Sequence, residues 1–142
     1  MGGVHQKQLL LTVEGNDDDF AAVEFALCQT ECFGGRIERA LSGQAALDFL
    51  KKQVPTVILL DLNLPGMLGY EVLTEVRSEP SLRRVPVVVL SSSSHPLDVA
   101  RCYEAGANSY ISKTADWARL RDIAESIAHY WFEISELPEA QA

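Results

Sequence analysis

Four short polar stretches in this chain contain the residue types that metal and phosphate chemistry requires. Asp61 directly follows an apolar run over residues 57–60, and Asn63 and the pair Pro65-Gly66 come soon after it. Burying a carboxylate at the end of such a run is costly unless a cation or hydrogen bonds compensate it. We therefore expect Asp61 to have a chemical role. The other stretches are an acidic segment with Glu14, Asp17 and Asp18, a serine run over residues 91–94, and the pair Ser112-Lys113.

The chemistry that fits these residue types together is phosphoryl transfer onto Asp61. Carboxylates are the ligands that Mg²⁺ prefers, and the metal neutralises charge as a phosphoryl group reaches the carboxylate. Lys113 can pair with one phosphoryl oxygen, and a hydroxyl such as that of Ser91 can donate to another. Because an acyl phosphate is labile, such a site suits a reversible mark.

The elements that must position these residues alternate regularly along the chain. Apolar runs predict strands over residues 8–13, 36–40, 56–60, 87–90 and 108–112, and helical spacing predicts helices over residues 17–31, 69–78, 97–105 and 116–136, with one more after Ser42. We expect Gly34-Gly35 to end the first helix and Gly106 the fourth. Five strands alternating with five helices predict an α/β fold with a doubly wound five-stranded parallel sheet. Its strand ends would gather the polar stretches on one rim.

Length and composition limit the possible functions. The 142 residues suit one domain, which we assign to residues 7–137, with flexible termini over residues 1–6 and 138–142. A net charge of −8 argues against binding to nucleic acid or to an anionic membrane. No apolar stretch approaches membrane-spanning length, and the start lacks a signal-peptide core, so we expect a cytoplasmic protein. Cys28, Cys32 and Cys102 contain no CxxC pair, so we expect plain thiols rather than a disulfide framework or a zinc site.

Over about residues 8–130 the chain resembles the receiver domains of two-component response regulators. The matching segments are LLLTVEGN, VILLDLNLPGMLGYEVL, PVVVLSSS and NSYISK. The resemblance implies a flavodoxin-like receiver fold in which a partner histidine kinase phosphorylates Asp61. It also implies that Mg²⁺ binds Asp61 and the backbone carbonyl of Asn63, and that Glu14 approaches the metal through water.

The same resemblance implies roles for the remaining polar residues. Ser91 would bind the phosphoryl group and move toward it, the backbone N–H of Ser92 would donate to it, and Lys113 would pair with the phosphorylated carboxylate. Tyr110 matches the aromatic residue that changes rotamer during switching. The protein would be a signalling protein and not an enzyme, beyond self-catalysed phosphoryl transfer and autodephosphorylation.

The chain departs from the family pattern at two positions. Receiver domains normally carry two adjacent acids after the first strand, and Gly15 replaces the second, which is the direct metal ligand. Three alternatives follow: Asp17 or Asp18 reaches the metal, an extra water fills its shell, or Mg²⁺ binds weakly and phosphorylation is slow or absent. Thr114 replaces the proline that follows the lysine in most relatives through a cis bond, so the geometry of the Lys113–Thr114 bond is open.

The predicted last helix is unusually long and carries an apolar stripe. Residues of the stripe recur at spacings of three and four over about five turns, which exceeds what packing on the sheet needs. Exposed aromatic residues near its end would mark an interface. We therefore expect homodimerisation through this helix, by way of Trp117, Ile127, Tyr130, Trp131 and Ile134.

Partners and rival functions follow from the same features. No output domain follows Pro138, so we expect a stand-alone regulator acting by protein contact, and the tail resembles the small response regulators of phytochrome-type histidine kinases. Haloacid-dehalogenase-type phosphatases are disfavoured, because they need an aspartate at position 63 and carry their motif on the first strand. The remaining rival is a pseudo-receiver, a phosphorylation-independent binding or dimerisation module whose metal chemistry Gly15 has removed.

Overall fold

Five parallel strands form the centre of the protein in a computed structural model that describes residues 8–138. Their spatial order is β2-β1-β3-β4-β5. The chain therefore adds β2 on one side of β1 and the later strands on the other, so the strand order reverses between β1 and β3. This arrangement confirms the predicted doubly wound parallel sheet. The strands are β1 (Leu9–Val13), β2 (Arg36–Ala40), β3 (Val57–Leu60), β4 (Val87–Ser91) and β5 (Ser109–Ser112).

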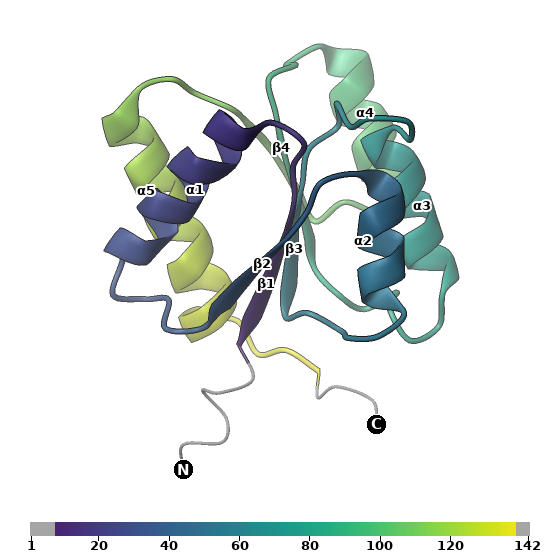
Figure 1. Ribbon diagram of the computed structural model, residues 1–142, viewed down its shortest axis with the longest axis horizontal. Helices are drawn as coiled ribbons and strands as arrows, with labels where there is room; N and C mark the ends of the chain where they lie inside the picture. Colours follow the sequence, from purple (N-terminus) through teal and green to yellow (C-terminus); the bar gives the residue numbers. More distant parts are fainter. Residues whose placement is uncertain (1–7, 139–142) are drawn as a thin grey trace.

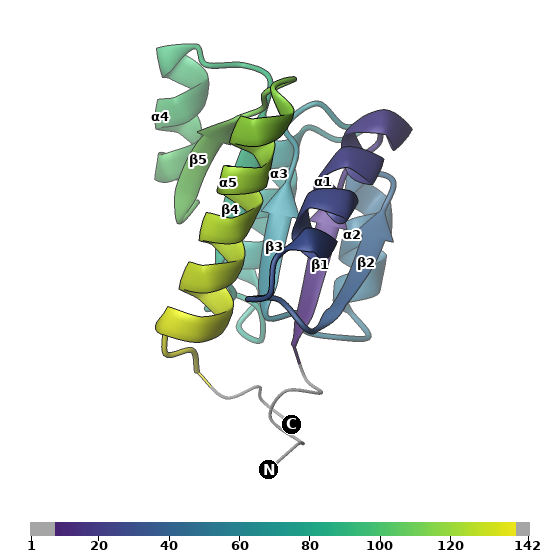
Figure 2. The ribbon, with the colours of Figure 1, turned by 90° about the vertical axis from the view of Figure 1, so that its left-hand side faces the viewer.

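The helices cover both faces of this sheet and produce three layers (Figures 1 and 2). On one face lie α1 (Asp17–Gln29) and α5 (Trp117–His129). On the other lie α2 (Gly43–Leu50), α3 (Gly69–Ser78) and α4 (Pro96–Glu104). No helix of the described region is long and apolar enough to cross a membrane.

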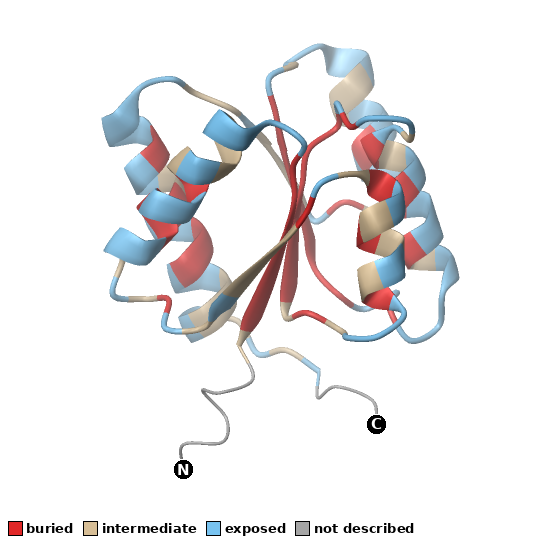
Figure 3. Ribbon diagram, viewed as in Figure 1, coloured by how far each residue is buried: buried red, intermediate tan, exposed pale blue. Residues whose placement is uncertain are grey.

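The strands are apolar because both of their faces are buried (Figure 3). Leu11 and Ile58 lie opposite each other and pack into the core beneath α2, α3 and α4. Leu10 and Val57, one residue earlier, are also paired and face α1 and α5. Burial of successive residues on opposite faces explains the continuous apolar runs, which are typical of parallel sheets.

Local capping signals fix where several helices begin and end. The Ser42 hydroxyl accepts a hydrogen bond from the Ala45 N–H at the start of α2, which confirms the predicted cap. The Asn16 side chain accepts one from the Asp19 N–H at the start of α1. Each such cap stabilises its helix by about 1 kcal/mol. Gly106 follows α4 with a φ of 108°, as its predicted role at the end of that helix requires.

The predicted end of the first helix was wrong. The helix ends at Gln29, because Thr30 adopts an extended conformation well before Gly34-Gly35. Gly35 instead lies against the start of β1, where an added Cβ would come within 2.5 Å of the Gln8 carbonyl oxygen. The two glycines therefore belong to the loop that leads into β2.

The last helix continues beyond its α-helical part as a π-helical turn, Tyr130–Ile134, and ends two residues before Glu136. The Ser135 N–H donates to the Tyr130 carbonyl at 2.7 Å and closes this turn. An extended last helix is therefore present, although its final turn is not α-helical. The predicted flexible termini, residues 1–6 and 138–142, lie outside the described residues except for Pro138.

Candidate functional site

The register of the sheet brings the polar strand ends together. Val13 lies opposite Leu60, so Glu14 and Asp61 leave neighbouring strands at the same level. The Asp61 N–H donates to the Val13 carbonyl at 3.0 Å, which continues the pairing past β3. Since the strand order reverses between β1 and β3, these carboxylates lie at the switch point where open α/β sheets bind ligands.

The Lys113 ammonium group is the centre of this site. Its Nζ lies 2.8 Å from Glu14 Oε1 and 3.2 Å from Asp61 Oδ2. A third carboxylate oxygen, Asp19 Oδ2, lies 2.7 Å from the same nitrogen. Glu14 and Asp61 are only 4% and 5% exposed, so the ammonium compensates two buried carboxylates at once.

The ion pairs and the burial shift the pKa values of two of these groups. Burial alone would lower the pKa of Lys113, but the hydrogen bonds to Asp19 and Glu14 and the charge of Asp61 raise it. Lys113 is therefore a permanent cation at neutral pH. Burial raises the pKa of Glu14, and it outweighs the opposing hydrogen bond from Lys113.

Of the three consecutive acids that begin α1, the third is the one that reaches the site. Asp17 instead pairs with Arg39, at 2.9 Å, and its side chain is largely exposed. Asp18 is exposed as well. Asp19, which the sequence did not single out, lies in the first turn of α1, where side chains tilt back toward the helix N-terminus. Asn16 caps α1, and this cap fixes which of the three acids lies one turn into the helix, namely Asp19.

The loop after β3 folds back over Asp61 and approaches Gly15. The Asn63 N–H donates to Asp61 Oδ1 at 3.3 Å, although the Asn63 side chain is exposed. A Cβ added at Gly15 would lie 3.0 Å from Pro65 Cδ and 3.2 Å from the Leu41 carbonyl oxygen. Position 15, where the resemblance to receiver domains implies a second acid, is therefore crowded in this chain.

The loop after β4 holds the predicted hydroxyl groups. Ser91 is fully buried, and its Oγ accepts a hydrogen bond from the Ser93 N–H at 3.2 Å. Ser92 is exposed. The Tyr110 hydroxyl donates to the Ser93 carbonyl at 2.7 Å, so this aromatic residue is bonded directly to the loop. The Lys113–Thr114 bond is trans, as are all other peptide bonds of the described residues.

The donor set of the site suits a hard divalent cation. Glu14, Asp61 and Asp19 supply carboxylate oxygens around the Lys113 ammonium group. Such all-oxygen sets favour Mg²⁺ or Mn²⁺ over softer metals. Since Lys113 is bonded to the three carboxylates, a metal ion would share their charge with the ammonium group.

The predicted interface residues of the last helix divide into two groups. Ile127 is 6% exposed and packs with Leu120 in the core beneath α5, so its assignment to an interface was wrong. Trp131 is partly buried against the same core and contacts the edge of Tyr130, at 4.7 Å between ring centroids. The exposed members are Trp117 at 39%, Tyr130 at 50% and Ile134 at 55%.

Two buried carboxylates paired with one lysine, at the switch point of a five-stranded parallel sheet, define a flavodoxin-like α/β domain. The chain belongs to the response regulator receiver domain family, whose sequence pattern matches residues 11–125. Its resemblance to that family is thereby confirmed.

Individual relatives match nearly the whole chain. Response regulator Rcp1 from Synechocystis sp. is 36% identical over 140 residues, which cover 94% of this chain and 95% of that protein. The crystal structure of the Mn²⁺-bound form of Rcp1 matches with a TM-score of 0.84 and 34% identity, over 93% of this chain and 99% of that chain. The phosphorylated cyanobacterial phytochrome response regulator RcpA matches with a TM-score of 0.87, 34% identity and the same coverage.

Proposed function

We propose that this chain is a stand-alone response regulator whose Asp61 accepts a phosphoryl group from a histidine kinase. The observation that carries the proposal is the Lys113 Nζ, 3.2 Å from Asp61 Oδ2 and 2.8 Å from Glu14 Oε1, at the switch point of the sheet. A surface carboxylate would need no such partner. A buried carboxylate held beside a lysine is equipped to receive an anion.

Each residue of the site would have a separate role in the phosphoryl transfer. As Asp61 attacks the phosphorus atom, the bond from phosphorus to the kinase histidine breaks and a bond to the carboxylate oxygen forms. Asp61 and the Asn63 carbonyl, with Glu14 acting through water, would hold Mg²⁺, and the ion would supply neutralisation of the charge that develops during the transfer. Lys113 would shift its ion pair from the carboxylate to a phosphoryl oxygen, and the exposed Ser92 would offer its backbone N–H.

The loop after β4 would carry the structural change caused by phosphorylation to the surface of the protein. Ser91 Oγ accepts from the Ser93 N–H, which leaves its own O–H to donate to a phosphoryl oxygen as Ser91 moves toward it. The Tyr110 hydroxyl donates to the Ser93 carbonyl, so the Tyr110 side chain would change its rotamer as that loop moves. Phosphorylation would thus alter the surface around α4 and β5, where a partner protein can read it.

A phytochrome-type histidine kinase is the partner class that we propose. The likeness to Rcp1 and RcpA over nearly the entire chain supports this assignment. We also propose a cytoplasmic location, in keeping with the acidic composition and with a kinase partner.

Homodimerisation through the end of the last helix is a further part of the proposal. Tyr130 and Ile134 are half exposed, as an interface requires. Trp117 lies about 140° from Tyr130 around the helix axis. It packs against Phe25 of α1, at 5.3 Å between ring centroids. The proposed dimer surface therefore consists of Tyr130 and Ile134.

The test of phosphorylation uses acetyl phosphate and millimolar Mg²⁺, followed by intact mass measurement. We expect an adduct of one phosphoryl group in the wild type and none in Asp61→Asn. Asp48→Asn is the matched control, because that aspartate is exposed on α2 away from the site, and it should be modified like the wild type. An adduct that persists in Asp61→Asn would contradict the assignment.

The rival function is a pseudo-receiver that binds partners without phosphorylation. Gly15 favours it, because the missing acid weakens the metal site, and Lys113 already compensates the buried carboxylates. A complete absence of adduct at millimolar Mg²⁺ would support this rival. In that case Asp61→Asn should bind the kinase as tightly as the wild type does.

A further inference from the structure

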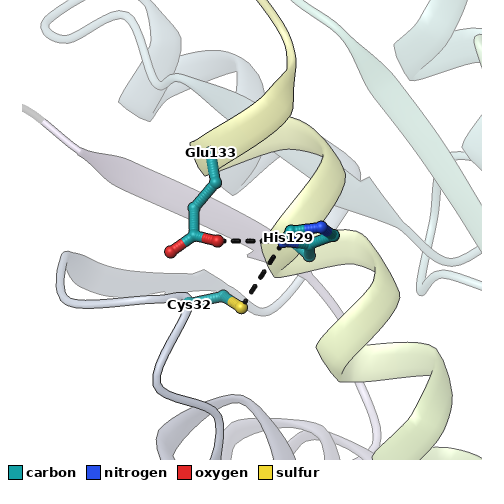
Figure 4. Close-up of side chains that lie close together, drawn as sticks. All are labelled: Cys32, His129 and Glu133. Atoms are coloured by element: carbon teal, nitrogen blue, oxygen red, sulfur yellow. Dashed lines mark hydrogen bonds and ion pairs between the residues drawn. The ribbon is translucent and has the colours of Figure 1, made fainter.

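A second cluster of side chains that can bind a metal lies near the C-terminal ends of α1 and α5 (Figures 1 and 4). This is the end of the sheet where the strands begin, whereas Asp61 follows the end of β3. His129 Nδ1 lies 3.8 Å from Cys32 Sγ and 2.9 Å from Glu133 Oε1. The three ligand atoms all lie within 4.8 Å of one another. Their separation in sequence hides them, since Cys32 precedes His129 by 97 residues.

The elements that carry the cluster are held together by contacts of their own. His129 is the last residue of α5, and Glu133 follows four residues later in the π-helical turn, on the same side. Cys32 lies in the loop after α1, where its N–H donates to Thr30 Oγ1 at 3.1 Å. The next residue, Phe33, is buried and packs edge-on against Phe132, at 4.9 Å between ring centroids. The ligand atoms are therefore positioned in advance of any ion.

The geometry disfavours a catalytic triad. In a nucleophile–histidine–acid relay the thiol and the carboxylate must contact different ring nitrogens, so that the proton passes across the imidazole. Here both face the same nitrogen, Nδ1 of His129 (Figure 4). A thiol and a carboxylate that both lie close to one imidazole nitrogen can instead bind the same cation together with that nitrogen.

We propose that Cys32, His129 and Glu133 bind Zn²⁺, with water as the fourth ligand. Sulfur, imidazole nitrogen and carboxylate oxygen together suit Zn²⁺, whereas Mg²⁺ and Ca²⁺ reject thiolate. A tetrahedral zinc ion with ordinary bond lengths separates its ligand atoms by about 3.4–3.6 Å. The distances of 3.8 Å and 2.9 Å to His129 Nδ1 bracket this range, and the third pair, Cys32 Sγ and the Glu133 carboxylate, lies within 4.8 Å, so side-chain shifts of at most about 1 Å bring the three atoms to tetrahedral separations.

The charges balance when zinc binds. The thiol releases its proton to solvent, and the imidazole binds as its Nε2–H tautomer, with Nδ1 free to coordinate. Thiolate and carboxylate then neutralise the two positive charges of the ion. His129 and Glu133 are exposed and Cys32 is partly exposed, which gives the ion a path of entry. The bound ion would join the loop after α1 to the π-helical turn.

The test uses the full chain without a polyhistidine tag, in millimolar Mg²⁺ to occupy the Asp61 site. Co²⁺ replaces Zn²⁺ as a probe, since a thiolate ligand produces a near-ultraviolet charge-transfer band and tetrahedral geometry produces strong visible bands. We expect both bands, and we expect Zn²⁺ to abolish them on addition of one equivalent. Competition with a chromophoric chelator then gives the zinc affinity.

Variants identify the ligands. Cys32→Ser should lose the charge-transfer band, and His129→Ala and Glu133→Gln should weaken zinc binding at least about tenfold. Cys28→Ser is the matched control, because it removes an exposed thiol four residues earlier, in α1, and it should behave like the wild type. Asp61→Asn should keep the band. Absence of the band in the wild type, or equal zinc affinity in Cys32→Ser, would overturn the proposal, as would a loss caused by Cys28→Ser.

Discussion

At the scale of single residues, Gly15 separates this chain from the pattern of its family. It lies next to Glu14, whose carboxylate forms an ion pair with Lys113. Asp19 reaches the same ammonium group from the start of α1. Asp19 is therefore the carboxylate best placed to assist a metal ion.

Restoring the acid should strengthen the metal site. In Gly15→Asp we expect Mg²⁺ affinity, measured by isothermal titration calorimetry, to rise roughly tenfold, because each added carboxylate ligand increases the attraction for the ion. The new side chain must displace the Pro65 ring, which lies 3.0 Å from the position of its Cβ. Gly15→Ala introduces the same crowding without the charge and should lower stability by about 1 kcal/mol. Equal Mg²⁺ affinity in both variants would show that the residue at this position does not contact the metal.

At the scale of elements, the polar side chain of Arg77 ties α3 to two loops. Its guanidinium donates to the carbonyls of Val85, at 2.8 Å, and Gly106, at 3.0 Å, and to Asn108 Oδ1 at 3.0 Å. Asn108 in turn accepts from the Val87 N–H at the start of β4. Arg77 thus connects α3 to the strands that carry Ser91 and Lys113.

Removing this guanidinium should destabilise the domain without touching the Asp61 site. We expect Arg77→Ala to lower the free energy of unfolding by about 2–4 kcal/mol, because three acceptors in two loops lose a charged donor and two of these bonds are partly buried. Urea denaturation followed by circular dichroism measures the change. Arg84→Ala, which removes an exposed guanidinium, should alter stability by less than about 0.5 kcal/mol. Similar losses in both variants would contradict the role of Arg77.

The elements were predictable where local signals are strong. Continuous apolar runs such as Val57–Leu60 and caps such as Ser42 identified the strands and α2, since these signals depend only on neighbouring residues. The end of α1 was missed because Thr30 breaks the helix, which residue preference alone does not indicate. Asp19 was missed because three acids in succession look alike until the helix start is known. The Cys32–His129–Glu133 cluster depends on packing between distant segments, which spacing in the sequence cannot indicate.

At the scale of the whole molecule, the exposed apolar residues decide how copies of the chain could associate. Trp131 packs on the core, so its replacement would disturb the fold along with any interface. Ile134 is 55% exposed at the end of the π-helical turn and is the better probe.

We expect Ile134→Asp to shift the protein from dimer to monomer in size-exclusion chromatography with light scattering. The buried charge would cost more free energy than a small interface supplies. The control is Leu97→Asp, which introduces the same charge at a 72% exposed leucine on α4. A monomeric wild type, or a dimer unaffected by Ile134→Asp, would remove this surface from consideration.

The three carboxylates around the Lys113 ammonium group also set a charge count for signalling. Glu14, Asp19 and Asp61 contribute three negative charges against one positive charge, a net of −2 before any metal binds. An acyl phosphate on Asp61 would replace one negative charge by about two, which brings the net to −3. Phosphorylation would therefore strengthen the attraction of the site for a divalent cation and hydrolysis would weaken it, so the lifetime of the signal should depend on the concentration of divalent ions in the cell.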